Sequence, residues 1–504
     1  MSYYYKFFEA YALANCNFCL PNVFLCQKPD RNPTPVTEYL VPNEKIRQET
    51  QRASFSLAME RRIHLIILIL TAIWIPWSVE VTLDVEPTRT KSNVTPENNV
   101  ANAINNFGYK LLLKMMNEKK NDNIVISPTG IAGLLAMTLL GTVGNTYNEI
   151  ADILGFSQDV LANRKNHEHL GELLKQLNVN VSSKTLYADA MFVNANTRIR
   201  QAYLNYLNYV YQGEALSTDF TRTEESKKVI NEWVKNHTEG KIETFLKQPL
   251  PASTVVVLVC ALYFSGQWEH PFRPKYTAKM AFKKGAEEVM ADLMLNFGEF
   301  YYTFSSKYDL HMIALPYNDS VTTMYALKPR FPNQLSLLQL MERLDYDKID
   351  NIIHRMTKKD CIIRFPKMEL ASSSNLASTL KALGLQTLFK PGEANFAFMV
   401  DDDLVVKKTG GELKARMNDK ETETRDFKDI LNGLPNPGIH VDTIIHDVKM
   451  SINEYGTEAV AATSALLART AEQFYADSPF YLFIRNERTK LVTFSAVIND
   501  PTFE

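Results

Sequence analysis

Near the C-terminal end the chain reads Glu454-Tyr455-Gly456-Thr457-Glu458-Ala459-Val460-Ala461-Ala462-Thr463-Ser464-Ala465. In an extended segment, successive side chains point to opposite faces. One face then carries only small residues: Thr457, Ala459, Ala461, Thr463 and Ala465. Gly456 lies where the backbone has to hinge, since glycine adopts conformations closed to other residues. Such a segment can slide between two existing strands without steric clash.

The residues just before this stretch alternate between apolar and polar. Ile444 to Ile452 has the period of two that predicts a strand. For residues 457–465 themselves, residue type alone leaves a second interpretation open. Alanine, leucine and glutamate are strong helix formers, so propensity alone predicts a surface helix there.

Length and composition point to a globular protein without visible enzyme chemistry. The chain has 504 residues, a formal net charge of −2 and 45% hydrophobic residues, and length alone predicts about three domains. A near-neutral charge gives no reason to expect nucleic-acid binding. The sequence has no Gly-rich phosphate loop, no Gly-x-Ser-x-Gly and no ordered set of metal ligands. We therefore predict that it is not an enzyme and needs neither a cofactor nor a metal.

The N-terminal part divides into three segments. Residues 1–58 hold Cys16, Cys19 and Cys26, but a single Cys-x-x-Cys without a second pair is a weak metal signal. Residues 59–79 join Met59-Glu60-Arg61-Arg62 to a short apolar run, which is typical of a secretory signal. We interpret residues 1–58 as an extension absent from the mature protein, with translation starting at Met59. An uncleaved signal anchor is the alternative. Residues 80–97 are predicted to be a polar linker.

Secretion agrees with further features of the chain. Asn180, Asn236 and Asn318 begin glycosylation sequons. Once the signal is removed, only Cys260 and Cys361 remain. Cys260 ends an apolar run and is predicted to be a small buried side chain. The mature fold then depends on its core and not on a disulfide framework.

The body of the chain begins near Asn98 with alternating helix and strand signals. Ala101 to Met116 has apolar residues at helical spacing. Asn123 to Ile126 reads as a strand ending at a helix start, with Ser127 as N-cap and Pro128 as the first helical residue. The following helix is apolar nearly all round and is predicted to be buried.

Many motifs along the chain, in order, resemble those of the serpin family. Residues 454–463 are similar to the serpin reactive-loop hinge, and the further matches are Ile126-Ser127-Pro128, Phe264-Ser265-Gly266-Gln267-Trp268-Glu269, Phe365-Pro366-Lys367-Met368, Ser478 to Ile484 and Val492 to Pro501. The resemblance covers residues 98–501 and replaces the three-domain expectation. It implies an α+β fold, namely a single serpin domain of three β-sheets with about eight or nine helices and an exposed reactive-centre loop at residues 454–478.

The resemblance also implies a mechanism. A serpin inhibitor is a substrate used once: a serine protease attacks the loop, forms an acyl-enzyme, and is trapped when the loop inserts into the large sheet. The hinge residues that it implies are Glu454, Gly456, Thr457, Glu458, Ala459, Ala461, Ala462 and Thr463.

The cleaved bond decides which protease is trapped. Arg469 is the only charged residue between Glu458 and Glu472, and its guanidinium suits a protease with an aspartate in its specificity pocket. We therefore predict cleavage at Arg469-Thr470 by a trypsin-like serine protease. The usual family spacing gives Thr470-Ala471 as the alternative. An elastase-like protease cutting after Leu466, Leu467 or Ala468 is a third.

The chain departs from the family pattern at two places. Serpins usually have a hydrogen-bonded Ser, Asn and His cluster in the middle of the large sheet. Here Ser127 and His446 match it, Cys260 takes the asparagine position and Gly130 a second serine position. Trp268 matches the tryptophan near the end of the sheet where the loop begins to insert. The second departure is a charged insertion at residues 401–437, which we interpret as a solvated loop.

Two other function classes stay open at this point. One is a non-inhibitory serpin acting as carrier or chaperone, although the small hinge residues argue against it. The other is a membrane-anchored interaction protein, if residues 63–77 are retained. Our prediction is a secreted, extracellular monomer. We predict no heparin site, because Arg164-Lys165 alone is too small a basic cluster.

Overall fold

The computed structural model describes residues 96–177, 183–285, 287–400, 434–455 and 471–502. The predicted extension, signal and almost all of the linker lie outside these residues, as do Asn180, most of the 401–437 insertion and residues 456–470 of the loop. The described residues contain nine α-helices: α3 (Pro96–Glu118), α4 (Pro128–Gly141), α5 (Gly144–Leu154), α6 (Val160–Leu177), α7 (Gln201–Tyr211), α8 (Thr223–His237), α9 (Leu337–Arg343), α10 (Tyr346–Ile353) and α11 (Ala377–Ala382). Short 3-10 turns are η1 (Pro274–Tyr276) and η2 (Thr387–Phe389).

A five-stranded sheet lies at the centre of the fold. Its order is β10–β11–β4–β2–β3, with bounds β2 (Ser183–Asn194), β3 (Glu214–Thr218), β4 (Val256–Gly266), β10 (Met368–Asn375) and β11 (Thr443–Ile452). The alternating run predicted as a strand is β11. It pairs in parallel with β4, from Thr443 opposite Val257 to Met450 opposite Phe264. Two strands separated by a long stretch of sequence are thus direct neighbours.

The second sheet is larger and has the order β1–β14–β13–β8–β7–β6–β9–β12, with β5 also paired to β6. Its strands are β1 (Ile124–Ile126), β5 (Ala278–Lys284), β6 (Glu287–Ser305), β7 (Leu310–Pro316), β8 (Thr322–Pro329), β9 (Thr357–Pro366), β12 (Glu472–Tyr475), β13 (Phe480–Asn486) and β14 (Val492–Ile498). Among the described residues we therefore find two hydrogen-bonded sheets where three were expected.

The long strand β6 explains this difference. Its first part pairs with β5 and β9, whereas its end, Tyr302 to Ser305, pairs with β7. The 19 residues of β6 form one continuous strand. This strand joins the part of the sheet that contains β5, β9 and β12 to the part that runs from β7 to β1, and without it the two parts would be separate sheets.

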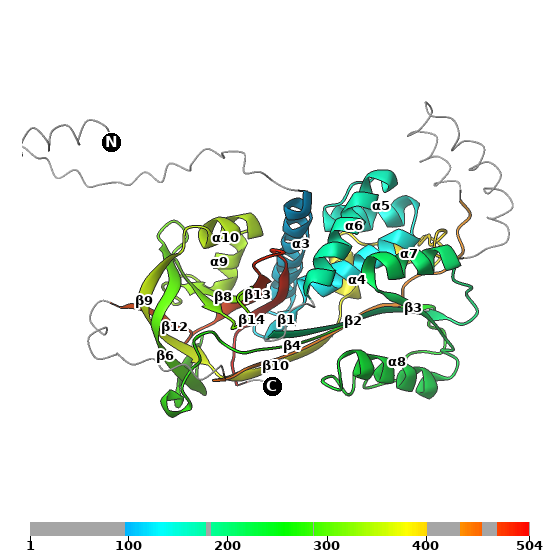
Figure 1. Cartoon of the computed structure of the whole chain (residues 1–504). Coiled ribbons are helices and arrows are strands. Elements are labelled where there is room, and N and C mark those ends of the chain that lie inside the picture. The colour runs from blue at the N-terminus through cyan, green and yellow to red at the C-terminus, as the bar shows by residue number, and fades with distance from the viewer. Residues whose placement is uncertain (1–95, 178–182, 286, 401–433, 456–470, 503–504) are drawn as a thin grey trace, which may run out of the picture. The chain divides into compact units, whose positions relative to one another are not determined.

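Helices cover both faces of the five-stranded sheet (Figure 1). Helix α4 is buried along almost its whole length, as its apolar sequence predicts. Ser127 caps its N-terminus by accepting a hydrogen bond from the Gly130 amide, and Pro128 is its first residue. Helix α8 packs on the opposite face, where Ile230 and Val234 meet Val257 and Val259 of β4.

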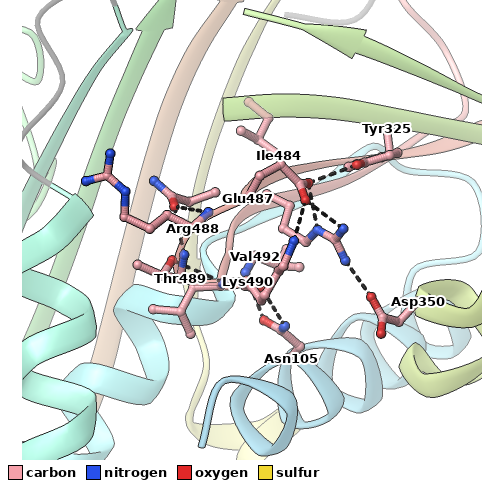
Figure 2. A network of polar contacts seen from close by, with 12 residues as sticks. Asn105, Tyr325, Asp350, Ile484, Glu487, Arg488, Thr489, Lys490 and Val492 are labelled. Atoms are coloured by element: carbon pink, nitrogen blue, oxygen red, sulfur yellow. Dashed lines mark hydrogen bonds and ion pairs between the residues drawn. The ribbon is translucent and has the colours of Figure 1, made fainter. Parts of the chain in front are cut away.

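A buried ionic network ties the β13–β14 turn to the surrounding helices (Figure 2). Arg485 is only 1% exposed. Its guanidinium pairs with Asp350 of α10 at 2.6 Å and with Glu487 at 2.8 Å. Glu487 also accepts a hydrogen bond from the Tyr325 hydroxyl at 2.9 Å. A buried charge is tolerated only when it is paired and hydrogen-bonded, so this network fixes the turn in one arrangement.

The described residues also bear on the cysteines and on a possible membrane-spanning helix. Cys260 and Cys361 are both buried and unpaired, so no disulfide links the described residues. In the same part of the chain, no helix combines the length and apolar character that spanning a bilayer requires.

Candidate functional site: the β4–β11 pair and the turn that leaves it

The candidate site begins where β11 ends and the chain turns toward the predicted loop. Asn453, Glu454 and Tyr455 follow the strand and are the last described residues before residue 456. Tyr455 is 69% exposed, whereas Glu454 is buried. The turn is therefore anchored by Asn453 and Glu454 before the chain emerges at Tyr455.

Trp268 holds one side of this turn. Its indole Nε1 donates a hydrogen bond of 2.9 Å to the carbonyl oxygen of Asn453, and its backbone amide approaches the Tyr455 carbonyl oxygen at 3.4 Å. The indole is buried and stacks on Tyr317, with ring centroids 4.4 Å apart and planes 16° from parallel. Because a buried indole N–H needs an acceptor, this ring fixes the backbone at the end of β11.

Gly266, the last residue of β4, makes this stacking feasible. A Cβ atom at this position would lie 2.6 Å from Cδ1 of Tyr317, which is inside van der Waals contact. The glycine in the Gly266-Gln267-Trp268 motif is therefore required by the close approach of the Tyr317 ring.

Glu454 holds the other side of the turn. Its carboxylate pairs with the Lys367 ammonium at 2.9 Å and accepts a hydrogen bond of 2.8 Å from the Thr277 hydroxyl. Burial raises the pKa of Glu454, but the hydrogen bonds from Lys367 and Thr277 outweigh it and hold the pKa below its ordinary value. Glu454 is therefore charged at neutral pH and binds the start of the loop to the residue between β9 and β10 and to the residue that follows η1.

A second cluster lies midway along the same pair of strands. The backbone amide of Ser127 donates to Nε2 of His446 at 2.9 Å, so the neutral imidazole carries its proton on Nδ1. Nδ1 lies 3.2 Å from Sγ of Cys260. Burial lowers the pKa of His446 to about 3, so the ring is neutral at pH 7. Cys260 is thus a hydrogen-bonding partner of His446 as well as the buried side chain that the sequence predicts.

The two unusual residues of this cluster, Cys260 and Gly130, are physically linked. A Cβ atom on Gly130 would lie 2.9 Å from Sγ of Cys260 and 3.0 Å from Oγ of Ser127. The sulfur atom therefore occupies the space that a larger side chain at position 130 would need. Cysteine at position 260 and glycine at position 130 form a compatible pair.

Sequence reasoning missed a further member of this cluster, Asp189. Asp189 of β2 pairs in register with Cys260 of β4, which pairs with His446 of β11. Side chains in register share a face of the sheet, so the three lie in one row. Burial raises the pKa of Asp189 to about 7, and its Oδ1 has no hydrogen-bond partner among the described residues. Only the register between strands places this carboxyl beside the thiol.

The remaining predicted site residues lie apart from these two clusters. Asn236 and Asn318 are exposed. The hinge residues Gly456 to Thr463 lie outside the described residues, as do Arg469 and Thr470. Ala471 is described and leads into β12, which pairs in parallel with β9 from Glu472 opposite Cys361.

Comparisons with known proteins agree with this fold. A family model described as "Serpin (serine protease inhibitor)" matches residues 102–501. Plasminogen activator inhibitor 1 of Sus scrofa is 28% identical over 403 residues, which is 78% of this chain and 91% of that protein. Leukocyte elastase inhibitor of Xenopus tropicalis is 28% identical over 413 residues, 80% of this chain and 100% of that protein. The solved structure of thyroxine-binding globulin in complex with thyroxine has a TM-score of 0.67 at 20% identity, and the match covers 80% of this chain and 100% of that one. At that identity, the structural match indicates the fold alone.

Proposed function

The chain belongs to the serpin family, and from this premise we propose that it inhibits a trypsin-like serine protease by inserting its cleaved loop between β4 and β11. It is not an enzyme: the nucleophile belongs to the target protease, and the inhibitor supplies a scissile bond. The protease acylates the loop, the loop inserts, and the attached protease is distorted before deacylation.

One observation carries this proposal: β4 and β11 are parallel neighbours. A segment that leaves β11 through a turn and folds back runs antiparallel to β11, and therefore also antiparallel to β4. Insertion replaces one parallel pairing by two antiparallel pairings, which are slightly more stable per residue. The sheet thus gains hydrogen bonds and a strand without changing the direction of any strand already present.

The composition of the loop also supports insertion between β4 and β11. The side chains of Thr457, Ala459, Ala461, Thr463 and Ala465 are small enough to enter a packed sheet. Glu454 and Trp268 hold the turn from which insertion starts. Ser127, Cys260 and His446 lie where the two strands must part. Insertion has to replace the contact between His446 and Cys260, and this contact therefore belongs to the barrier.

Specificity in this proposal rests on Arg469, with Arg469-Thr470 as the cleaved bond and Thr470-Ala471 as the alternative. An elastase-like target is the second candidate, supported by the similarity to a leukocyte elastase inhibitor and by the apolar residues 466–468. A carrier function, which the sequence left open, is the third. The small hinge residues favour inhibition over carriage.

The proposal includes secretion as a glycosylated monomer after removal of a signal at residues 59–79. The exposure of Asn236 and Asn318 is compatible with glycosylation at both positions. The N-terminal sequence of protein recovered from the medium tests this part, because a peptide from residues 1–58 would contradict a start at Met59.

The experiment that tests the inhibitory function is incubation of the protein with trypsin and, in parallel, with an elastase. We expect a covalent complex with trypsin that resists SDS, and mass spectrometry should identify Arg469 as the new C-terminus. A stable complex with elastase but not with trypsin would mean that the protease cleaves after one of residues 466–468. Cleavage without a stable complex with either protease would contradict an inhibitory role.

A further inference from the structure

A cavity of about 300 Å³ lies beside the first residue of β12. It is away from the β4–β11 pair, and the proposed mechanism does not use it. Side chains from four strands and from the end of β8 line it, among them Tyr302, Phe304, His311, Arg330, Lys359 and Glu472. Its walls therefore combine aromatic rings with cationic groups.

Arg330 is the cation without an acidic partner in this cavity. Its guanidinium lies over the rings of Phe304 and Phe331, 4.6 Å and 4.8 Å from their centroids. It forms no ion pair with any carboxylate of the described residues. Its backbone amide is fixed by a hydrogen bond of 2.7 Å to the Asp309 carbonyl oxygen. Stacking on aromatic rings orients the planar fork before any ligand arrives.

Lys359 and Glu472 add a pair of opposite charges. Their side chains form an ion pair of 2.9 Å, and the Lys359 ammonium also lies 5.5 Å from the centroid of the Tyr302 ring. The two charges cancel, so the Arg330 charge remains as a surplus. An oxyanion near Arg330 would also compete with Glu472 for Lys359.

His311 is held rigidly between the aromatic walls. Its Nδ1 is hydrogen-bonded to the hydroxyl of Tyr302, and its ring lies 5.9 Å from the Tyr302 centroid and 5.3 Å from the Phe304 centroid. Burial lowers the pKa of His311 to about 4, and the positive charges of Lys328 and Arg330 add to this effect, while Glu472 opposes it. Nε2 is the imidazole nitrogen left for a ligand.

We propose that this cavity binds a small organic oxyanion, a carboxylate or sulfate group carried on a planar apolar body. The guanidinium of Arg330 supplies paired N–H donors that match the two oxygens of such a group. The rings of Tyr302 and Phe304 provide apolar surface for its body. Because the ligand competes with Glu472 for Lys359, its binding loosens the ion pair that fastens the start of β12 to β9.

The test is a titration of the full chain with sodium benzoate, and with sodium acetate for comparison, at constant ionic strength held by chloride. Histidine side chains labelled with ¹⁵N report the binding. We expect one histidine signal, assigned through His311→Gln, to shift saturably, with benzoate binding at least tenfold more tightly than acetate. Arg330→Gln should weaken benzoate binding tenfold or more.

Arg355→Gln is the matched control, because Arg355 is an exposed arginine outside the cavity. This variant should bind benzoate with the same affinity as the wild type. Equal affinities for benzoate and acetate, or an unchanged affinity in Arg330→Gln, would overturn the proposal. Arg330 is exposed, and an unaltered urea midpoint will establish that its variant is folded. Formation of the SDS-stable trypsin complex is measured without benzoate, so the inhibitory function and the anion site can fail independently.

Discussion

The indole Nε1 of Trp268 lies 2.9 Å from the carbonyl oxygen of Asn453 and donates a hydrogen bond to it. The two residues are 185 positions apart in the sequence. Through this bond the segment that follows β4 fixes the backbone just after β11, from which the proposed loop departs. The relationship makes the turn at residues 453–455 a defined structural element.

Trp268→Phe should loosen this turn. Phenylalanine keeps a ring against Tyr317 but removes the donor to Asn453, so the free energy of unfolding should fall by about 1 kcal/mol. Limited proteolysis with a glutamate-specific protease, followed by mass spectrometry, should show faster cleavage after Glu454. Trp233→Phe is the control, because Trp233 of α8 loses a comparable hydrogen bond to Glu214 of β3. Equal cleavage rates in the two variants would contradict an anchoring role for Trp268.

Gly130→Ala tests the compatibility of Gly130 with Cys260. The added methyl group meets Sγ of Cys260, and overpacking of this kind costs about 1–3 kcal/mol. Cys260→Ala leaves His446 Nδ1 without its partner and should cost a similar amount. The double variant should cost less than the sum of the two by at least about 0.5 kcal/mol, because the smaller residue makes room for the methyl group. Urea unfolding of all four proteins measures this, and strict additivity would refute the steric link.

Two groups in the row of Asp189, Cys260 and His446 change the free energy of unfolding in opposite directions as the pH falls. His446 has a folded-state pKa of about 3, below its ordinary 6.5. From pH 6.5 downward, the unfolded state therefore binds a proton that the folded state does not, and acidification destabilises the fold. Asp189 has a folded-state pKa of about 7, above its ordinary 3.8. Between pH 7 and pH 4 the folded state binds the extra proton, and acidification stabilises the fold.

Asp189→Asn should expose the His446 effect. We expect its free energy of unfolding to fall relative to the wild type by up to about 1.4 kcal/mol per pH unit as the pH drops from 6 to 4.5. Urea unfolding at pH 6.5, 5.5 and 4.5 measures the difference. Asp122→Asn, which changes an exposed carboxyl, should keep the wild-type slope. If the free energies of unfolding of Asp189→Asn and the wild type changed equally with pH, the Asp189 carboxyl would not titrate in this range.

Arg469→Ala tests the proposed specificity. The variant should lose the SDS-stable complex with trypsin but keep its urea midpoint, since a substitution in a loop that the sequence predicts to be exposed should cost little stability. Arg469→Lys retains a cation for the aspartate in the protease pocket and should keep most of the inhibition. If Arg469→Ala trapped trypsin at the original rate, cleavage would occur at another bond, with Thr470-Ala471 as the first to examine.

Thr457→Arg tests the insertion mechanism. If Thr457 enters the sheet first, with its side chain toward the core, arginine there buries an unpaired guanidinium, which costs several kcal/mol even after relaxation. Trypsin should still cleave at Arg469, but deacylation should win, so gels should show cleaved protein without the covalent complex. Glu458→Arg, on the other face of the same segment, should retain the complex. An undiminished complex in Thr457→Arg would mean that this segment does not insert.

Several features of this protein follow from the sequence alone, because their physical causes lie within a few residues of one another. The Ser127 cap, Pro128 at the first helical position and the buried helix α4 follow from local hydrogen bonding and apolar content. Strand β11 follows from its period-two alternation. The order of motifs from residue 98 to residue 501 indicated the family, which in turn gave the α+β fold.

The tertiary structure alone decided which distant groups meet. His446 and Cys260 are 186 residues apart, and neither strand carries information about its register with the other. The register between β2 and β4 places Asp189 beside the thiol. The approach of Cys260 and Ser127 to Gly130 leaves position 130 without room for a side chain, and the end of β11 brings Glu454 to Lys367. The merging of two expected sheets through β6 has the same origin, since the length of the strand is local but its partners are not. Side-chain pattern thus determines the elements, whereas close packing between elements far apart in the sequence determines the contacts from which the site is built.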